Sequence, residues 1–408
     1  MRILLVQSPV GRPEAPIYPI GLAYLAGSLK NHSIKGLDLS LSADPAEDLR
    51  NALEEFSPEV VAVSLRNIDD SAYPETFWYL DSFGLIMDTL KDWKGFVITG
   101  GAGFSIYAEK ILQIWDRIDL GLRGEGENCM QSIISWISGG EKPYWINGRF
   151  AQPPRPDLKD VPSPDYSLFP ACDYPGKGAV GVQTRRGCVF NCAYCTYKTI
   201  SGKGFRLRPV EDVVNDIIQI KKQGFDSFMF VDSVFDHPVK YFNELVDAIA
   251  KIDDPPVWEA WLSESVPLDS LSKMSRAGCK WVDFSPDVIS RKGWKLMGKG
   301  GDIRKLWPAV KAAREAGMVV GVNFFSATPG ENFVALVRKF LFMMRARLQL
   351  GWNSTFINIG TIRLYKGSSL AGKLHPGEEL FEPIFYKPAG AADLLIKAFQ
   401  RLRKLRRS

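Results

Sequence analysis

The stretch TRRGCVFNCAYCTYKTISGKGFRLRP, residues 184–209, decides how the fold of this chain is interpreted. It holds Cys188, Cys192 and Cys195, which are half of the six cysteines in 408 residues. Six cysteines are too few to staple so long a chain with disulfides, and three of them on one loop are typical of a metal centre.

Zinc and an iron–sulfur cluster are the two candidates for these thiols. Structural zinc takes four protein ligands, and the nearest histidine, His237, is distant in the sequence. A [4Fe–4S] cluster held by three thiolates leaves one iron open, and S-adenosylmethionine (SAM) offers that iron an amino and a carboxylate group. The spacing therefore favours a cluster with Cys188, Cys192 and Cys195 as ligands.

Strand and helix patterns alternate on the C-terminal side of this stretch, which indicates repeated βα units. The predicted strands are 181–184, 227–232, 257–265, 280–287, 318–330 and 355–365. The predicted helices between them are 209–224, 238–252, 267–278, 303–317 and 332–347.

Residues 1–140 alternate in the same way, and their short apolar runs predict a parallel sheet with helices on both faces. Ligands bind such sheets at the carboxyl ends of the strands, where this chain has the loops SLRNIDD (64–70), TGGAG (99–103) and RGEGE (123–127). No G-x-G-x-x-G follows the first strand, so a dinucleotide is not favoured. A helix is expected over 74–93.

Residues 141–177 lose this periodicity. They hold many prolines, which predicts an extended linker between the two α/β domains. Cys172 lies in this linker and is interpreted as incidental, whereas Cys129 and Cys279 are expected to be buried apolar thiols.

The order of YPIGLAYLAGSLKN, PEVVAVSLRNIDD, VITGGAGFS and GLRGEGE resembles the cobalamin-binding domain of B12-dependent radical SAM enzymes of the class B methyltransferase type. The resemblance implies a flavodoxin-like (Rossmann-type) domain over 1–140. No D-x-H-x-x-G is present, so it implies base-off cobalamin without a protein histidine ligand. Arg66 is then either a neighbour of the lower corrinoid face or simply a partner of Asp69 or Asp70. The cobalamin contacts implied are Ser64, Leu65, Arg66, Asn67, Gly100, Gly101, Ala102, Gly124, Glu125, Gly126 and Glu127.

The cysteine motif, with Tyr194 directly before the third cysteine, is similar to that of the radical SAM superfamily. This resemblance implies a partial (β/α)6 radical SAM barrel over 178–370. Each acidic residue it singles out is also open to the simpler role of a solvated loop carboxylate. The SAM contacts implied are Tyr194, Asp232, Ser233, Glu264, Ser285, Asp287 and Asn323.

The function implied by the resemblance is that of an enzyme with a [4Fe–4S] cluster, SAM and cobalamin. It would methylate an unactivated carbon through a 5′-deoxyadenosyl radical and methylcobalamin; the catalytic residues stay unassigned. The alternatives are a B12-dependent cyclase, a ring-rearranging or oxidising enzyme, a radical SAM enzyme that has lost cobalamin, and a non-catalytic cobalamin or cluster sensor.

The formal net charge of +5 is concentrated in the last 18 residues, AADLLIKAFQRLRKLRRS, within an extension over 371–408. We expect a basic C-terminal helix there, with at most a peripheral membrane role and no nucleic-acid partner. The other expectations are a small-molecule or natural-product substrate, an external one-electron reductant of the flavodoxin or ferredoxin type, and a cytoplasmic location.

Overall fold

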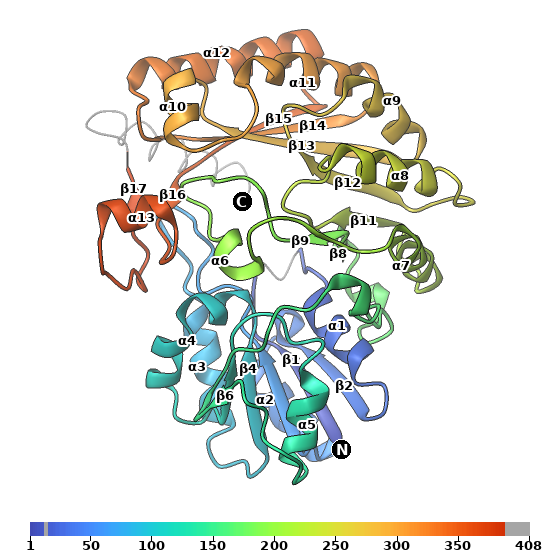
Figure 1. Cartoon of the computed structure of the whole chain (residues 1–408), viewed down its shortest axis with the longest axis vertical. Helices are drawn as coiled ribbons and strands as arrows, with labels where there is room; N and C mark the ends of the chain where they lie inside the picture. The colour runs from blue at the N-terminus through green and yellow to red at the C-terminus, as the bar shows by residue number, and fades with distance from the viewer. Residues whose placement is uncertain (12–14, 388–408) are drawn as a thin grey trace. The chain divides into compact units, whose positions relative to one another are not determined.

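The computed structural model of the chain describes residues 1–11 and 15–387 and divides into two compact units (Figure 1). The first unit comprises Met1–Asp70, Trp78–Gly187 and Thr199–Met229, and the second comprises Ser71–Phe77, Cys188–Lys198 and the chain from Phe230 onward. The cysteine loop is therefore grouped with strands that follow it in the sequence. The predicted boundaries at residues 140, 177 and 370 stay predictions, and most of the predicted basic helix, from residue 388, lies outside the described residues.

A seven-stranded sheet forms the centre of the first unit. Its order is β2-β1-β3-β4-β5-β7-β6, and every neighbouring pair is parallel except β6 with β7. The first five strands have the flavodoxin-like order 2-1-3-4-5, which confirms the predicted fold class. The strands are β1 (Arg2–Gln7), β2 (Ser33–Asp38), β3 (Val60–Ser64), β4 (Phe96–Gly100), β5 (Leu120–Leu122), β6 (Ile146–Asn147) and β7 (Phe150–Ala151).

Helices cover this sheet, and local sequence sets their ends. Ile3, Leu4, Leu5 and Val6 of β1 are all 0% exposed, as expected for a parallel strand covered on both faces. Asp44 begins α2 by accepting hydrogen bonds from the backbone N–H groups of Ala46 and Glu47. The helices are α1 (Ile20–Ser28), α2 (Pro45–Phe56), α3 (Tyr79–Thr89), α4 (Ala102–Ile114) and α5 (Met130–Ile137).

Two local predictions need correction. The helix expected over 74–93 begins only at Tyr79, because residues 71–77 belong to the second unit, where the Tyr73 ring lies 5.3 Å from that of Phe385. The segment 141–177 is not only a linker, since β6 and β7 form within it and add to the first sheet. Both differences depend on contacts with residues far away in the sequence.

The first unit also contains the short elements that flank the cysteine loop. They are β8 (Val180–Val182), β9 (Arg185–Arg186), β10 (Arg206–Leu207) and α7 (Val210–Lys222); α6 (Tyr197–Ser201) and β11 (Ser227–Phe230) lie at the boundary of the two units. Strands β9 and β10 pair in antiparallel fashion, with Arg206 opposite Arg186.

Four parallel strands form the sheet of the second unit, in the order β12-β13-β14-β15. Figure 1 shows most of the helices of this unit along one face of these strands. With β8 and β11 of the first unit, all six strands predicted for the barrel are present. The elements are α8 (Val239–Ile249), β12 (Val257–Leu262), α9 (Leu268–Arg276), β13 (Cys279–Asp287), α10 (Arg291–Leu296), α11 (Leu306–Glu315), β14 (Val319–Phe325), α12 (Phe333–Leu350), β15 (Thr355–Gly360), β16 (Ile362–Arg363), α13 (Ser369–Leu374) and β17 (Phe385–Tyr386).

The strands of the second unit present different side chains to their two faces. Along β12, Trp258, Ala260 and Leu262 are buried, whereas Glu259 and Trp261 are only partly buried. This period of two places the polar side chains on the face opposite the buried core. That face is where a barrel of this kind presents polar groups to a ligand.

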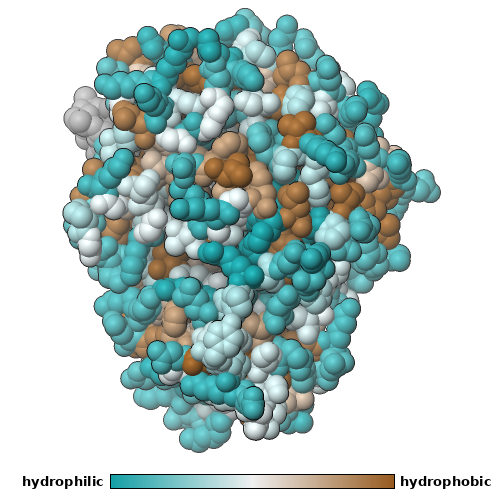
Figure 2. Space-filling model, in the orientation of Figure 1, coloured by the Kyte–Doolittle hydropathy of each residue, from teal (hydrophilic) through white to brown (hydrophobic). Residues whose placement is uncertain are grey.

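Side chains of different polarity share the surface. Hydrophobic residues are scattered among hydrophilic ones on the face that Figure 2 shows. Within the described part of the chain, no helix is both long enough and apolar enough to cross a membrane.

Candidate functional site

Each unit has a cavity next to the ends of its strands. The first, which we call the glycine cavity, has a volume of about 230 Å³ and lies where β3, β4 and β5 end and α1 begins. Its wall is largely apolar and includes Gly100, Gly101, Gly124 and Gly126. Backbone at these positions can approach a large flat ligand closely because no side chain intervenes.

The loop after β4 needs glycine for two separate reasons. Gly101 has φ +101°, and a Cβ there would lie 2.6 Å from the carbonyl oxygen of Leu65. Gly103 donates its N–H to the carbonyl oxygens of Leu65 and Arg66, at 3.1 and 2.8 Å. The 99–103 loop is thereby packed directly against the 65–67 loop, and α4 begins at a fixed point beside the cavity.

A buried ion-pair network closes one side of the glycine cavity. Arg186 donates to Glu127 at 2.6 and 3.1 Å and to Glu125 at 2.9 Å, and Arg206 donates to Glu125 at 3.0 Å. The side chains of Arg186, Glu125 and Glu127 are only 7–9% exposed. Burial alone would raise the pKa of Glu127, but the guanidinium of Arg186 outweighs it and holds that pKa below its usual value.

The structure brings together most of the residues predicted to contact cobalamin. Leu65 is buried, and Arg66 and Asn67 are exposed; these three do not line the cavity. The predicted residues that do line it are Ser64, Gly100, Gly101, Ala102, Gly124, Glu125, Gly126 and Glu127.

Sequence reasoning missed Tyr24, Gln183 and Arg186, which line the same cavity. Arg186 lies two residues before the first cluster cysteine, and the double arginine of the opening stretch was the available signal. Tyr24 lies on α1, and its ring centroid is 5.2 Å from the Arg186 guanidinium.

The second cavity, which we call the thiol cavity, has a volume of about 240 Å³ and belongs to the second unit. Cys188, Cys192 and Cys195 all line it. Polar side chains complete its wall: Ser233, Ser263, Glu264 and Ser285 come from the ends of strands, and Lys299 comes from the loop after α10. The predicted cluster loop and the predicted barrel strands thus meet at one site.

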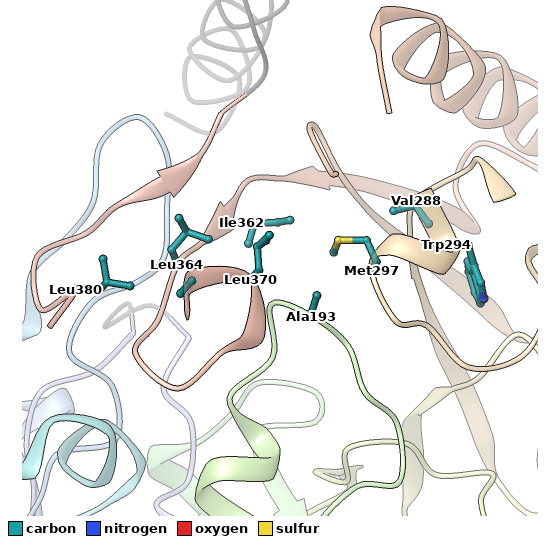
Figure 3. Close-up of a cluster of buried hydrophobic side chains, with 9 residues drawn as sticks. Ala193, Val288, Trp294, Met297, Ile362, Leu364, Leu370 and Leu380 are labelled. Carbon is teal, nitrogen blue, oxygen red and sulfur yellow. The ribbon is translucent and has the colours of Figure 1, made fainter. Parts of the chain in front are cut away.

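The cysteine loop is held at its middle residue. Ala193 donates its N–H to the carbonyl oxygen of Met297 at 2.8 Å, and its own carbonyl accepts from Leu370 at 2.7 Å. Its side chain belongs to a buried cluster that includes Met297, Leu370 and Ile362 (Figure 3). A Cβ on Gly298 would lie 2.4 Å from the carbonyl oxygen of Asn191, so this turn packs tightly against the loop.

The arrangement of the thiols fits a cluster better than zinc. Among the described residues, no three His, Cys, Asp or Glu side chains are arranged to hold a single metal ion. The three cysteines are free and partly exposed, whereas Cys129 and Cys279 are buried as predicted. Three thiols around one cavity, without a fourth, match a cluster with one open iron.

A buried charged group lies behind the thiols. Asp287 accepts hydrogen bonds from Tyr194 Oη at 2.8 Å and from Lys299 Nζ at 2.6 Å. The Asp287 backbone has φ +66° and follows an irregularity in β13, which turns this carboxylate away from the regular strand alternation. Burial opposes the charge of Lys299, but the neighbouring carboxylate outweighs burial and raises the pKa of that lysine.

Glu264 carries the most informative titration in this cavity. It is 6% exposed, and burial raises its pKa to about 7, although Lys299 opposes the shift. The carboxyl is therefore close to half-ionised near neutral pH. A cationic ligand group would favour its ionised form.

The other predicted SAM residues divide into two groups. Tyr194, Ser233, Glu264 and Ser285 line the thiol cavity, and Asp287 is bonded directly to Tyr194. Asp232 is buried and does not line the cavity, and Asn323 lies within β14, where its amide donates to Asp283 at 3.1 Å. Ser263, which directly follows β12 and was expected within the strand over 257–265, also lines the cavity.

Comparisons with known proteins agree with both sites. The family model of the radical SAM superfamily matches residues 182–339, and that of the B12 binding domain matches residues 9–134. An uncharacterized methyltransferase, PH0819, of Pyrococcus horikoshii is 26% identical over 356 residues, which cover 81% of this chain and 75% of that protein. The hopanoid C-3 methylase of Methylococcus capsulatus is 23% identical over 330 residues, covering 76% of this chain and 61% of that protein.

A solved structure shows the same fold. The radical SAM methyltransferase TsrM from Kitasatospora setae, with cobalamin and a [4Fe–4S] cluster bound, superposes with a TM-score of 0.77 and 21% identity, covering 91% of this chain and 77% of that one. The B12 binding domain match contains the loops of the glycine cavity, and the radical SAM match contains the thiol loop. The chain therefore contains a B12 binding domain followed by a radical SAM domain.

Proposed function

We propose that this protein is a cobalamin-dependent radical SAM methyltransferase that adds a methyl group to an unactivated carbon of a small molecule. The observation that carries the proposal is the thiol cavity, where three cysteines and the polar ends of the strands line one space. The names of the relatives, a methyltransferase and a methylase, support methyl transfer as the reaction.

The residues of the thiol cavity have distinct roles in this proposal. Cys188, Cys192 and Cys195 would hold the [4Fe–4S] cluster, which when reduced supplies the electron that cleaves SAM. Glu264 and Ser233 would bind the amino-acid end of SAM, with the Glu264 carboxylate accepting a hydrogen bond from its amino group. Tyr194 would pack against SAM, held in orientation by its hydrogen bond to Asp287.

The glycine cavity would bind the cobalamin, which supplies the methyl group. None of the three histidines of the chain lines this cavity, which supports a base-off cofactor without a protein ligand. Glu125, Glu127 and Arg186 would keep the wall rigid and charge-balanced while leaving the glycine backbone open to the corrinoid. Arg66 is exposed and available as a neighbour of the lower face.

The substrate class proposed is a small molecule, as tryptophan is for TsrM in a second structure of that enzyme. Electrons would come from an external carrier of the flavodoxin or ferredoxin type, and the site of action would be cytoplasmic.

Anaerobic reconstitution with iron, sulfide and hydroxocobalamin tests this proposal, with the matched triple variant C188A/C192A/C195A as control. We expect about four iron atoms and about one cobalt per wild-type chain, and no iron in the variant. With SAM and a reductant, methyl transfer would release S-adenosylhomocysteine as well as 5′-deoxyadenosine.

Two results would count against the proposal. Iron without retained cobalt would leave a radical SAM enzyme that has lost cobalamin. The second result is a protein that retains cobalt and forms 5′-deoxyadenosine but no S-adenosylhomocysteine with any candidate substrate. That result would favour cyclisation, ring rearrangement or oxidation.

A further inference from the structure

The surface of α12 carries an unusual concentration of exposed apolar side chains. Leu348 is 69% exposed, Leu341 59% and Phe333 56%. Six apolar residues lie one, three, four or seven positions apart in the sequence, which places them on one side of the helix. We call them the apolar face of α12. They are Phe333, Val334, Val337, Phe340, Leu341 and Leu348.

This face is not required to build the core. The same helix buries Ala335, Lys339, Met343 and Ala346 on its other side, and that side packs toward the sheet. Trp352, just beyond the helix, is a further exposed apolar side chain, with an exposed fraction of 53%. An apolar surface of this extent usually marks an interaction site rather than ordinary solvent exposure.

Exposed cations lie beside the apolar face. A shallow depression of about 600 Å³ is lined by Arg291, Lys292, Arg304 and Arg338, together with Trp307. Arg345, about two turns after Arg338 along α12, lies with its guanidinium 3.9 Å from the Trp307 ring centroid. We call Arg291, Lys292, Arg304, Arg338 and Arg345 the basic rim.

Nearby acids do little to offset this charge. The sequence 333–352 contains no aspartate or glutamate. Asp302 is paired with Arg304 at the rim, and Glu331 is buried in an ion pair with Lys339. The apolar face is therefore flanked by positive charge with little compensation.

From this juxtaposition we propose that α12 docks the protein on the surface of a membrane that contains anionic lipids. The apolar face would enter the boundary between headgroups and acyl chains, as the apolar side of an interfacial helix does, and the basic rim would contact lipid phosphates. Trp307 and Trp352 have the amphipathic rings that favour this boundary. The helix would lie on the membrane, in agreement with the absence of a spanning helix among the described residues.

A second copy of the chain is a poorer occupant. A two-fold interface through α12 would bring two basic rims toward each other, and like charges across an interface are unfavourable. An anionic bilayer would bury the apolar face and pair the basic rim with lipid phosphates at the same time. This surface is separate from the thiol and glycine cavities, and it differs from the basic C-terminal segment singled out by the sequence.

Co-sedimentation of the full-length reconstituted protein with vesicles tests the proposal. Phosphatidylcholine vesicles with roughly 30 mol% phosphatidylglycerol are compared with pure phosphatidylcholine. We expect binding to the anionic vesicles that weakens as salt is added, and little binding to the neutral ones.

Matched double variants identify the surface. V337E/L341E should lower the partition coefficient about tenfold or more, because two charges replace apolar groups that would be buried in the membrane. L85E/L268E makes the same charge change at two apolar residues of similar exposure, 44% and 45%, on α3 and α9, and should change binding by less than about twofold. R338E should weaken binding to anionic vesicles only.

Each contrary outcome overturns the proposal. One such outcome is that the full chain fails to bind anionic vesicles. Another is that V337E/L341E binds them as well as wild type does, which would assign binding to the C-terminal segment. Light scattering that shows a wild-type dimer and a V337E/L341E monomer, without vesicle binding, would assign the face to a second copy. SAM turnover without vesicles is measured in every variant, so a failure of membrane binding can be distinguished from a failure of the proposed function.

Discussion

The glycine cavity and the thiol cavity have nearly the same volume, about 230 and 240 Å³, but they are built from different parts of the chain. The first depends on backbone, with glycines and a rigid ion-pair network around a largely apolar space. The second depends on side chains, with thiols, hydroxyls and buried charges at the ends of strands. The difference suggests that one site recognises the shape of its ligand and the other its chemistry.

The sharpest test of this contrast removes one thiol. We expect C192A to lose the cluster and all SAM cleavage, because three thiolates are the minimum set the loop supplies. Iron analysis and the visible spectrum after anaerobic reconstitution measure the effect. Cys172→Ala, at an exposed cysteine outside the cavity, is the matched control and should retain full iron content. Normal iron in C192A would show that another residue ligates the cluster.

The ion-pair network of the first unit has the next largest expected effect. R186M leaves Glu127 buried without its arginine partner, while Glu125 keeps Arg206, and the free energy of unfolding should fall by about 3–5 kcal/mol. Denaturant unfolding measures the loss. The double variant R186M/E127Q removes the stranded charge as well and should recover most of it. If R186M alone were as stable as wild type, the network would not be the rigid wall described above.

Glycine substitutions separate backbone strain from steric clash. G101A combines φ +101° with a Cβ only 2.6 Å from a carbonyl oxygen, so we expect roughly 3 kcal/mol of destabilisation and reduced cobalamin retention. G124A has a similar φ of +99° with nothing within 4 Å, and should cost about 1 kcal/mol. Unfolding and cobalt content are measured for both. Equal effects would mean that the close approach to the Leu65 carbonyl is unimportant.

Glu264 gives a smaller, pH-dependent effect. Its pKa of about 7 in the folded protein lies above the ordinary value near 4.5, so between these pH values the folded state holds a proton that the unfolded state has lost. Stability contributed by this group therefore falls as pH rises through that window, and E264Q should be more stable than wild type by about 2 kcal/mol at pH 8 but not at pH 5. Unfolding of the cofactor-free protein at both pH values measures this.

The same substitution should weaken SAM binding, because an amide oxygen accepts a hydrogen bond from the SAM amino group less strongly than a carboxylate does. Calorimetric titration of SAM into the cluster-loaded protein checks it. A stability gain that does not depend on pH, or unchanged SAM affinity, would contradict the role given to Glu264.

Particular residues show how far the sequence was sufficient. The three cysteines, Tyr194 and the glycine loops were predicted from local information, because spacing marks the thiols and glycine marks where backbone must turn or come close. In the structure the thiols and Tyr194 line one cavity, and most of the loop glycines line the other. Asn323 was assigned to the cavity and instead bonds to Asp283 and Asn358 within the sheet. Its position along β14 depends on strand register, which sequence periodicity does not fix.

By itself, then, the sequence determined the two α/β domains and the cysteine motif, because apolar periodicity and cysteine spacing are properties of neighbouring residues. Its resemblance to a known family supplied the cofactor classes. Only the tertiary structure decided which distant groups meet. It paired Arg186 with Glu125 and Glu127, some sixty residues earlier, bonded Lys299 and Tyr194 to Asp287, and left the apolar face of α12 exposed. These features arise from packing between segments far apart in the chain, where burial and charge balance, rather than local pattern, set the free energy.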